Sequence, residues 1–245
     1  MARVRPGEAA NPAPPTVQRI RVRFAKRGRL RFLSHRDVAR SVERAVRRAG
    51  IPVSYSHGFS PHPRLSWIGA APTGAASEAE YLEIGLSEPC DVDRVRAALD
   101  AALPPGLDVV AVVVAPAGAL ADLLTGSSWQ IHLVGVSFAV VQQAVQAVLA
   151  AESVGVERMT KSGIRAFDVR PAVVALAAVV QPDDAVQVQL TTLHQEPLVR
   201  PDDVLSAMAK LVPAFTPREV PILTRLSQGL LDRETGTIRD PLAPR

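Results

Sequence analysis

Three histidines, His35, His57 and His62, lie close together in the sequence within a basic segment. Next to the first of them are Ser34, which can cap a helix, and Asp37, which can act as an acid or base. Ser34 stands three residues before Asp37, the spacing of a capping box at the start of a helix. His35 would then lie at the positive end of that helix, where a neutral imidazole is favoured and an anion can bind. The candidate catalytic residues are His35, Asp37 and His62, and the sequence leaves open whether the chain is an enzyme.

A proline-rich loop carries the other two histidines. His57 and His62 flank the sequence Gly-Phe-Ser-Pro, and Pro61 and Pro63 stiffen the turn. Such a loop could bind phosphate, act as general acid or base on a ribose 2′-hydroxyl, bind a metal with Asp37, or only hydrogen-bond its own backbone. The spacing matches no known metal motif, so we expect no metal and no cofactor. We expect one pocket lined by Ser34, His35, Ser56, His57, Gly58, Phe59 and His62.

Arginine is concentrated next to these residues. Between Arg19 and Arg48 there are twelve basic and two acidic residues, whereas Glu78 to Asp108 contains eight acidic residues and two arginines. Planar guanidinium groups suit phosphate, so we expect RNA as the anionic partner. The alternative is a solvated face that pairs with the acidic block. The predicted nucleic-acid-binding residues are Arg21, Arg23, Arg36, Arg40, Arg44, Arg47, Arg48 and Arg64.

Periodicity indicates which elements position this segment. Residues 19–24 alternate strictly between arginine and apolar residues, which predicts a half-buried strand. Apolar residues spaced i, i+4, i+7 and i+8 then predict a helix from about Ser34 to Ala49, ended by Gly50. Further extended segments are expected at 52–55, 64–70, 79–86 and 107–115, with a helix from Asp91 to about Leu103. When the exact number of strands around the histidine–proline loop is set aside, this order is β-α-β-β-α-β, which is that of a ferredoxin-like unit.

The second half of the chain follows a similar order. Strands are predicted at 128–137, 154–159, 163–169, 173–180, 186–193 and 219–226, and helices at 138–151 and 201–211. We therefore expect an α+β protein with two tandem ferredoxin-like units and antiparallel sheets. The predicted divisions are a flexible tail (1–16), the first unit (17–115), a linker (116–128), the second unit (129–231) and a second flexible tail (232–245).

Composition narrows the protein class. The chain has 245 residues, 47% of them hydrophobic, and a formal net charge of +4. No apolar run approaches the roughly 20 residues that span a bilayer, so we expect no membrane partner. A single cysteine excludes a disulfide framework and a multi-cysteine iron–sulfur site within this sequence. Together with the lack of a secretory signal, this predicts a cytoplasmic protein.

Four segments resemble the radical-SAM-linked domain family, whose activity is uncharacterised: Lys26–Asp37, Glu43–Pro52, Tyr55–Pro63 and Gly74–Tyr81. The resemblance covers roughly residues 17–200. His35, Asp37 and His62 fit the family pattern, whereas Arg36 replaces a usual aliphatic residue and His57 a common acidic one. Members occur alone or fused behind a radical-SAM module, and in some bacteria lie beside ribonuclease E/G genes. The resemblance therefore implies a radical-SAM enzyme or ribonuclease E/G as a partner.

Three functions agree with these observations. We expect an RNA-binding accessory protein in tRNA or rRNA processing or modification, with its arginines on phosphates. The first alternative is a metal-independent RNA-processing enzyme that uses His35 or His62 as acid or base. The second is a protein adaptor that docks on a radical-SAM enzyme or ribonuclease through the acidic block.

Overall fold

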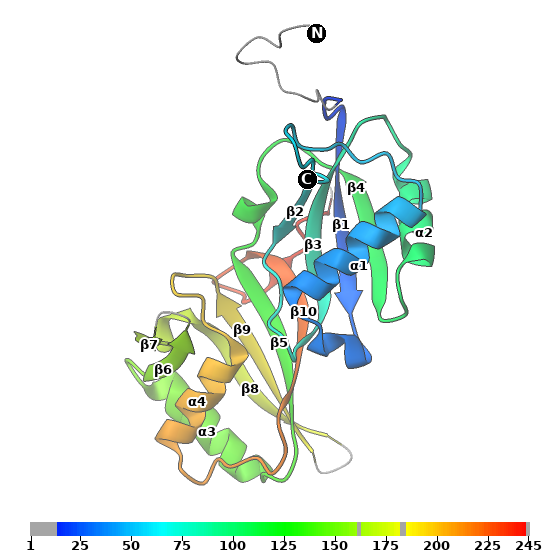
Figure 1. The fold of residues 1–245 in the computed structure, drawn as a ribbon. Coiled ribbons are helices and arrows are strands. Elements are labelled where there is room, and N and C mark those ends of the chain that lie inside the picture. Colours follow the sequence, from blue (N-terminus) through cyan, green and yellow to red (C-terminus); the bar gives the residue numbers. More distant parts are fainter. Residues whose placement is uncertain (1–13, 161–162, 182–184, 244–245) are drawn as a thin grey trace, which may run out of the picture. The chain divides into compact units, whose positions relative to one another are not determined.

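The computed structural model describes residues 14–160, 163–181 and 185–243 (Figure 1). The predicted N-terminal tail (1–16) thus lies almost wholly outside the described residues. The fold is mixed α+β, with four α-helices and a mostly antiparallel sheet of nine strands in the described part of the chain. The chain divides into two compact units, one formed by residues up to Thr73 with Ala79–Ala121, the other by Gly74–Glu78 with Asp122–Ala243.

The first unit contains the basic segment and both helices predicted there. Its elements are β1 (Gln18–Lys26), the 3-10 helix η1 (Gly28–Phe32), α1 (His35–Arg48), β2 (Leu65–Ile68), most of β3 (Ala76–Leu86), α2 (Val92–Ala102), β4 (Leu107–Val114) and the start of η2 (Leu120–Leu123). Its strands lie in the order β4-β1-β3-β2, and the β1–β4 and β2–β3 pairs are antiparallel.

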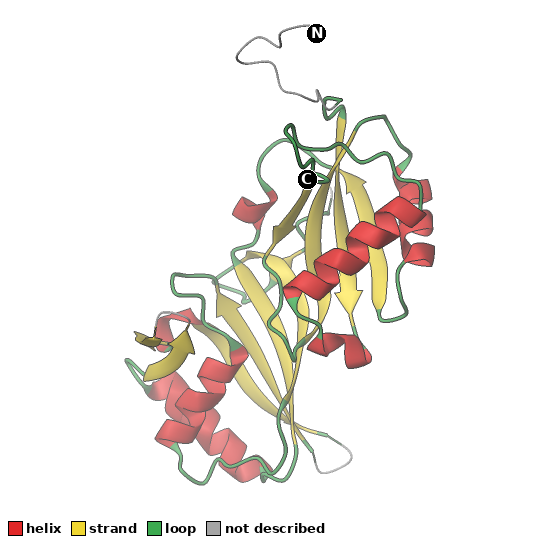
Figure 2. Ribbon diagram, in the orientation of Figure 1, coloured by secondary structure: helices red, strands yellow, loops and turns green. Residues whose placement is uncertain are grey.

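Both helices of this unit lie on the same face of its strands (Figures 1 and 2). Ile20, Val22 and Phe24 of β1 pack in one buried cluster with Val42 of α1 and Leu99 of α2. Because side chains alternate along a strand, Arg19, Arg21 and Arg23 point to the opposite face, away from α1 and α2. The alternation predicted for residues 19–24 therefore sets up a helix-covered face and an open face.

The second unit has a similar element order with an added hairpin. Its elements are β5 (Gly126–Leu133), α3 (Phe138–Ala150), β6 (Gly155–Thr160), β7 (Gly163–Asp168), the 3-10 helix η3 (Arg170–Ala172), β8 (Val173–Val180), β9 (Val186–Leu193), α4 (Pro201–Leu211), β10 (Ile222–Leu231) and β11 (Ile238–Arg239). Its strand order is β10-β5-β9-β8, and β6 pairs only with β7. The first residues of β3, Ala76 and Ser77, pair in parallel with Thr224 and Arg225 of β10.

Two of the predicted boundaries contain secondary structure. The range 116–128, predicted as a linker, includes η2 and the first residues of β5, and the division between the units falls at Ala121 within it. Ile238 and Arg239, in the range predicted as a flexible C-terminal tail, pair with Leu231 and Leu230 of β10. In the described residues, no helix combines the length and apolar character needed to cross a bilayer.

Candidate functional site

The start of α1 is capped as its sequence predicts. The Ser34 Oγ accepts a hydrogen bond from the Asp37 backbone N–H at 3.3 Å and donates one to Asp37 Oδ2 at 2.6 Å. This side-chain bond, with a smaller contribution from the charge of Arg40, lowers the pKa of Asp37. Asp37 is therefore an ionised capping residue at neutral pH. His35 is exposed, and its ring meets that of Trp67 edge-on at 5.4 Å.

The histidine–proline loop is closed by its own backbone. Ser56 N–H donates to the His62 carbonyl at 2.8 Å, and His62 N–H donates to Ser56 Oγ at 3.0 Å. Gly58 has φ 124°, a value that favours glycine. His57 is exposed and Phe59 is 96% exposed. The loop is thus an ordered turn that holds His62 in place and leaves Phe59 in solvent.

The predicted single pocket is divided between two faces of the first unit, which corrects the prediction. On β2, Trp67 points to the helix-covered face, where its ring lies 6.0 Å from that of Phe24 and also contacts His35. The preceding residue, Ser66, points to the open face and lines a cavity with Ser56 and His62. Ser34 and His35 therefore do not share a site with His62, and the two histidines cannot act as one acid–base pair.

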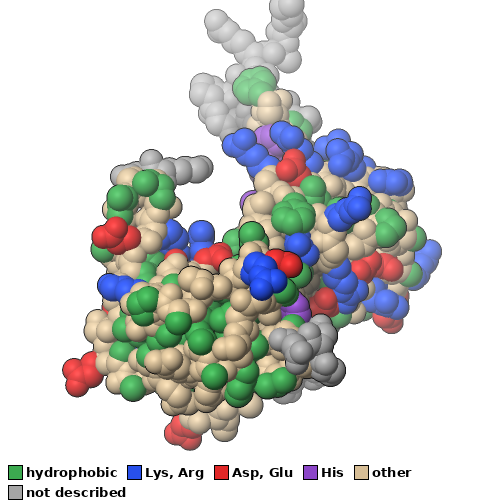
Figure 3. All heavy atoms as spheres, turned by 90° about the horizontal axis from the view of Figure 1, so that it is seen from below, with side chains coloured by type: hydrophobic (Ala, Val, Ile, Leu, Met, Phe, Trp, Pro, Cys, Tyr) green, Lys and Arg blue, Asp and Glu red, His purple; other side chains and the backbone are tan. Residues whose placement is uncertain are grey.

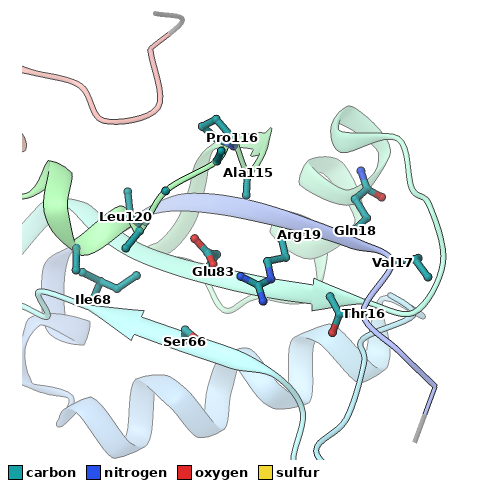
Figure 4. Close-up of a pocket in the computed structure, with 14 residues that line it drawn as sticks. Thr16, Val17, Gln18, Arg19, Ser66, Ile68, Glu83, Ala115, Pro116 and Leu120 are labelled. Atoms are coloured by element: carbon teal, nitrogen blue, oxygen red, sulfur yellow. The ribbon is translucent and has the colours of Figure 1, made fainter.

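The open face carries two adjoining cavities of about 660 and 370 Å³. Thr16, Arg19, Ser66 and Glu83 line both of them. Figure 4 shows the Arg19 side chain between Glu83 and Thr16 above the strands. Arg19 is not among the predicted site residues. The alternation of residues 19–24 nevertheless places it on this face, together with Arg21 and Arg23. His62 and Arg64 line the smaller cavity.

Arg21 is not a surface phosphate ligand, contrary to the prediction. Only 1% of its side chain is exposed, and its Nε lies 3.1 Å from Glu83 Oε2. A second nitrogen donates to the carbonyl oxygens of Pro116 and Gly118. Arg21 therefore ties β3 and the chain after β4 to β1 and supports the floor of the larger cavity.

The arginines of α1 have the accessibility that the prediction requires. Arg36, Arg40, Arg44, Arg47 and Arg48 are all exposed. None of the five forms an ion pair within the described residues, and Arg44 donates only to Ser41 Oγ at 3.4 Å. At 100° per residue their common direction is opposite the buried side of α1, formed by Val38, Val42, Ala45 and Val46. Figure 3 shows many Lys and Arg side chains at the upper right of the view, with others at separate places on the surface.

The two remaining predicted arginines, Arg23 and Arg64, are either less exposed than those of α1 or hydrogen-bonded to the backbone. Arg23 is half-buried on the open face of β1. Arg64 is exposed, and its Nε donates to the Tyr55 carbonyl at 3.3 Å. Arg64 therefore keeps its predicted accessibility, beside His62.

Several carboxylates of the acidic block hold elements of the first unit together. Glu83 pairs with Arg21, Asp108 pairs with Arg27 at 2.8 Å, and Asp100 accepts the Val109 N–H at 2.7 Å. These carboxylates neutralise other arginines and cap backbone groups instead of pairing with α1. In the part of the chain that the structure describes, no three His, Cys, Asp or Glu side chains are grouped so that they could hold a metal ion.

Comparison with known proteins places the chain in a family without giving it an activity. No curated protein matches the sequence. A family model described as an uncharacterized protein conserved in bacteria, DUF2344, matches residues 19–201, which include the α1 arginines, the histidine–proline loop and most of the second unit. The chain belongs to the DUF2344 family.

Proposed function

We propose that the protein binds RNA through the exposed arginine face of α1, as an accessory factor in RNA processing or modification. The observation that carries the proposal is the set of five exposed arginines without carboxylate partners among the described residues. A helix that concentrates like charges at i, i+4 spacing is destabilised by their repulsion, and an anionic partner relieves that repulsion. A phosphate backbone supplies negative charges in a row.

The proposed interaction does not use aromatic stacking, because α1 contains no Phe, Tyr or Trp and the exposed rings of Phe32 and Phe59 lie outside this helix. The chain has an aromatic content of 4%, and the two tryptophans of the described residues are partly or fully packed, Trp67 against Phe24 and Trp129 in the core of the second unit. Sequence-specific single-strand readers generally stack bases on exposed aromatic rings. The proposed contacts are therefore to phosphates, and we expect recognition of RNA shape and charge.

Salt dependence tests the proposal directly. If each of the five arginines contacts one phosphate of a single strand, the slope of log K against log salt is about −3.5, from about −0.7 per contact. Replacing two of them in the variant Arg40→Gln/Arg44→Gln should make the slope less negative by about 1.4. Fluorescence anisotropy with a labelled single-stranded RNA at several salt concentrations measures both values.

A matched control is available on the neighbouring helix. Arg94 and Arg96 of α2 are also exposed, so Arg94→Gln/Arg96→Gln removes the same charge without touching α1. We expect its slope to match that of the unmodified protein. Binding that does not respond to salt, or equal changes in the two double variants, would overturn the proposal.

Two finer assignments go with this function. We propose that both units are ferredoxin-like, because numbering the strands along each unit gives the order 4-1-3-2 in both, once the β6–β7 hairpin and the short strand β11 are set aside. We further propose that the family is the radical-SAM-linked one, so that a radical-SAM enzyme or a ribonuclease of the E/G type acts with this chain. Co-purification that survives nuclease treatment would support a direct protein contact.

A further inference from the structure

The open face of the first unit contains a continuous trough that the α1 arginines do not reach. We define the trough as the two adjoining cavities that share Thr16, Arg19, Ser66 and Glu83. Their volumes, about 660 and 370 Å³, fall within the range of small-molecule sites. Because α1 packs on the other face of the same strands, the trough is separate from the proposed RNA contact.

One end of the trough can bind an anion. His62 and Arg64 line this end, and Arg19 borders it from β1. Within the described residues no hydrogen bond or ion pair engages the Arg19 guanidinium, and the Nε of Arg64 alone is used, by the Tyr55 carbonyl. Two guanidinium groups with open donors beside an imidazole match a phosphate group, which accepts charge-assisted hydrogen bonds from several sides.

The other end is mainly apolar. Ile68, Pro116 and Leu120 line it with alanines 115, 117, 119 and 121. Figure 4 shows Ile68 and Leu120 near each other at the end away from Thr16, and Pro116 beside Ala115 nearer the middle of the cavity. A flat ring or an apolar group that packs here removes apolar surface from water. A ligand that fills both ends therefore carries an anionic group at one end and a flat or apolar group at the other.

Glu83, between the two ends, adds a requirement for a hydrogen-bond donor. Its Oε2 is held by the buried Arg21 at 3.1 Å, and 18% of its side chain remains exposed. In the described part of the chain no donor contacts its other carboxylate oxygen. An ionised carboxylate accepts hydrogen bonds only, so a ligand next to it gains from an N–H group that points toward Oε1.

We propose that the trough binds a nucleoside monophosphate unit with a guanine base. The phosphate lies at the His62–Arg64 end beside Arg19, and the base lies toward Ile68 and Leu120. The imino and amino N–H groups of guanine can donate side by side to Glu83, one to Oε1 and the other to the remaining lone pair of Oε2. Adenine offers a single amino N–H beside an acceptor ring nitrogen, which the carboxylate repels. The same unit can come from a free nucleotide or from the 5′-phosphorylated end of an RNA.

Isothermal titration with GMP tests this assignment. We expect GMP to bind at least tenfold more tightly than guanosine, which lacks the phosphate, and at least tenfold more tightly than AMP. The variants Arg19→Met and Arg64→Met should each weaken GMP binding at least tenfold, whereas Arg94→Met on the exposed side of α2 should not. Ser66→Leu, which narrows the trough from the edge strand β2, should also weaken binding.

Separate outcomes distinguish this site from the RNA contact on α1. Arg40→Gln/Arg44→Gln should bind GMP as the unmodified protein does, even if its RNA binding changes. Displacement of GMP by a 5′-phosphorylated oligoribonucleotide beginning with guanosine identifies an RNA end as the source, and no displacement identifies the free nucleotide. The proposal is overturned if GMP does not bind at millimolar concentration, if AMP binds equally well, or if Arg19→Met and Arg94→Met have equal affinities.

Discussion

Glu83→Gln should lower the free energy of unfolding of the first unit strongly, although the substitution hardly changes the size of the side chain. The side chain keeps its size and one acceptor oxygen but loses the charge that faces Arg21 at 3.1 Å, where Arg21 is 1% exposed and Glu83 18% exposed. Removing one partner of a buried ion pair costs about 3–5 kcal/mol, because the other charge stays buried without compensation. Since the Gln oxygen and the carbonyls of Pro116 and Gly118 still accept bonds from Arg21, we expect the lower end, about 3 kcal/mol.

An exposed ion pair in the same unit provides the comparison. Arg27 and Asp108 approach more closely, at 2.8 Å, but their side chains are 48% and 41% exposed. Pairs in such surroundings contribute about 0–1 kcal/mol. Arg27→Gln should therefore cost no more than about 1 kcal/mol. If distance decided the energy, the order of the two variants would be reversed.

Urea unfolding followed by tryptophan fluorescence measures the difference. In a Trp129→Phe background the signal comes from Trp67, whose ring packs against Phe24 in the first unit. With a slope of about 1–3 kcal/mol per molar urea, a loss of about 3 kcal/mol lowers the midpoint by about 1–3 M. Glu83→Gln and Arg27→Gln with midpoints equal within error would refute the argument. The double variant Arg21→Met/Glu83→Leu should recover part of the loss, because it leaves no buried charge unpaired.

Two further predictions concern the pH dependence of stability and the start of α1. The ring of His194 donates from Nδ1 to the Leu124 carbonyl and accepts from the Ser127 hydroxyl, both at 2.7 Å, and burial lowers its pKa below the ordinary 6.5. The unfolded chain then binds the proton more readily, so the free energy of unfolding should fall as pH drops below about 6.5, and His194→Gln should flatten this dependence in urea titrations. Ser34→Ala removes the cap of α1 and should cost about 1 kcal/mol by thermal denaturation, whereas Ser41→Ala within the helix should not; equal melting temperatures would contradict the role of the cap.

Local patterns predicted both helices of the first unit and most of its strands, whereas the extended segment predicted at 52–55 forms only isolated bridges at Val53 and Tyr55. The apolar spacing of α1 places Val38, Val42, Ala45 and Val46 on one side, and these four are its buried residues. The Ser34 cap depends on two residues three positions apart. Both features depend only on residues within one or two helical turns of each other, so they can be predicted from neighbouring residues in the sequence.

The arrangement of the candidate site could not be predicted in the same way. Alternation correctly separates the arginines of β1 from its apolar side chains, but it cannot tell which arginine is covered. Arg21 is buried because Glu83 lies beside it and because the carbonyls of Pro116 and Gly118 close over it. These partners are 62 to 97 residues away in sequence. The separation of His35 from His62 likewise depends on the face to which each residue of β2 points.

The three arginines of β1 show how one alternating strand can supply different functions. Arg19 is exposed at the rim of the trough, Arg23 is half-buried, and Arg21 between them is fully buried. All three share a face, so their different burial follows from what packs above each position and not from the strand itself. The buried guanidinium fixes the carboxylate of Glu83, and the fixed carboxylate gives the trough an acceptor beside the open donors of Arg19. The structural ion pair and the proposed binding site are therefore parts of one arrangement, and loss of the buried pair should disorder the trough while the α1 arginines, on the other face, keep their exposure.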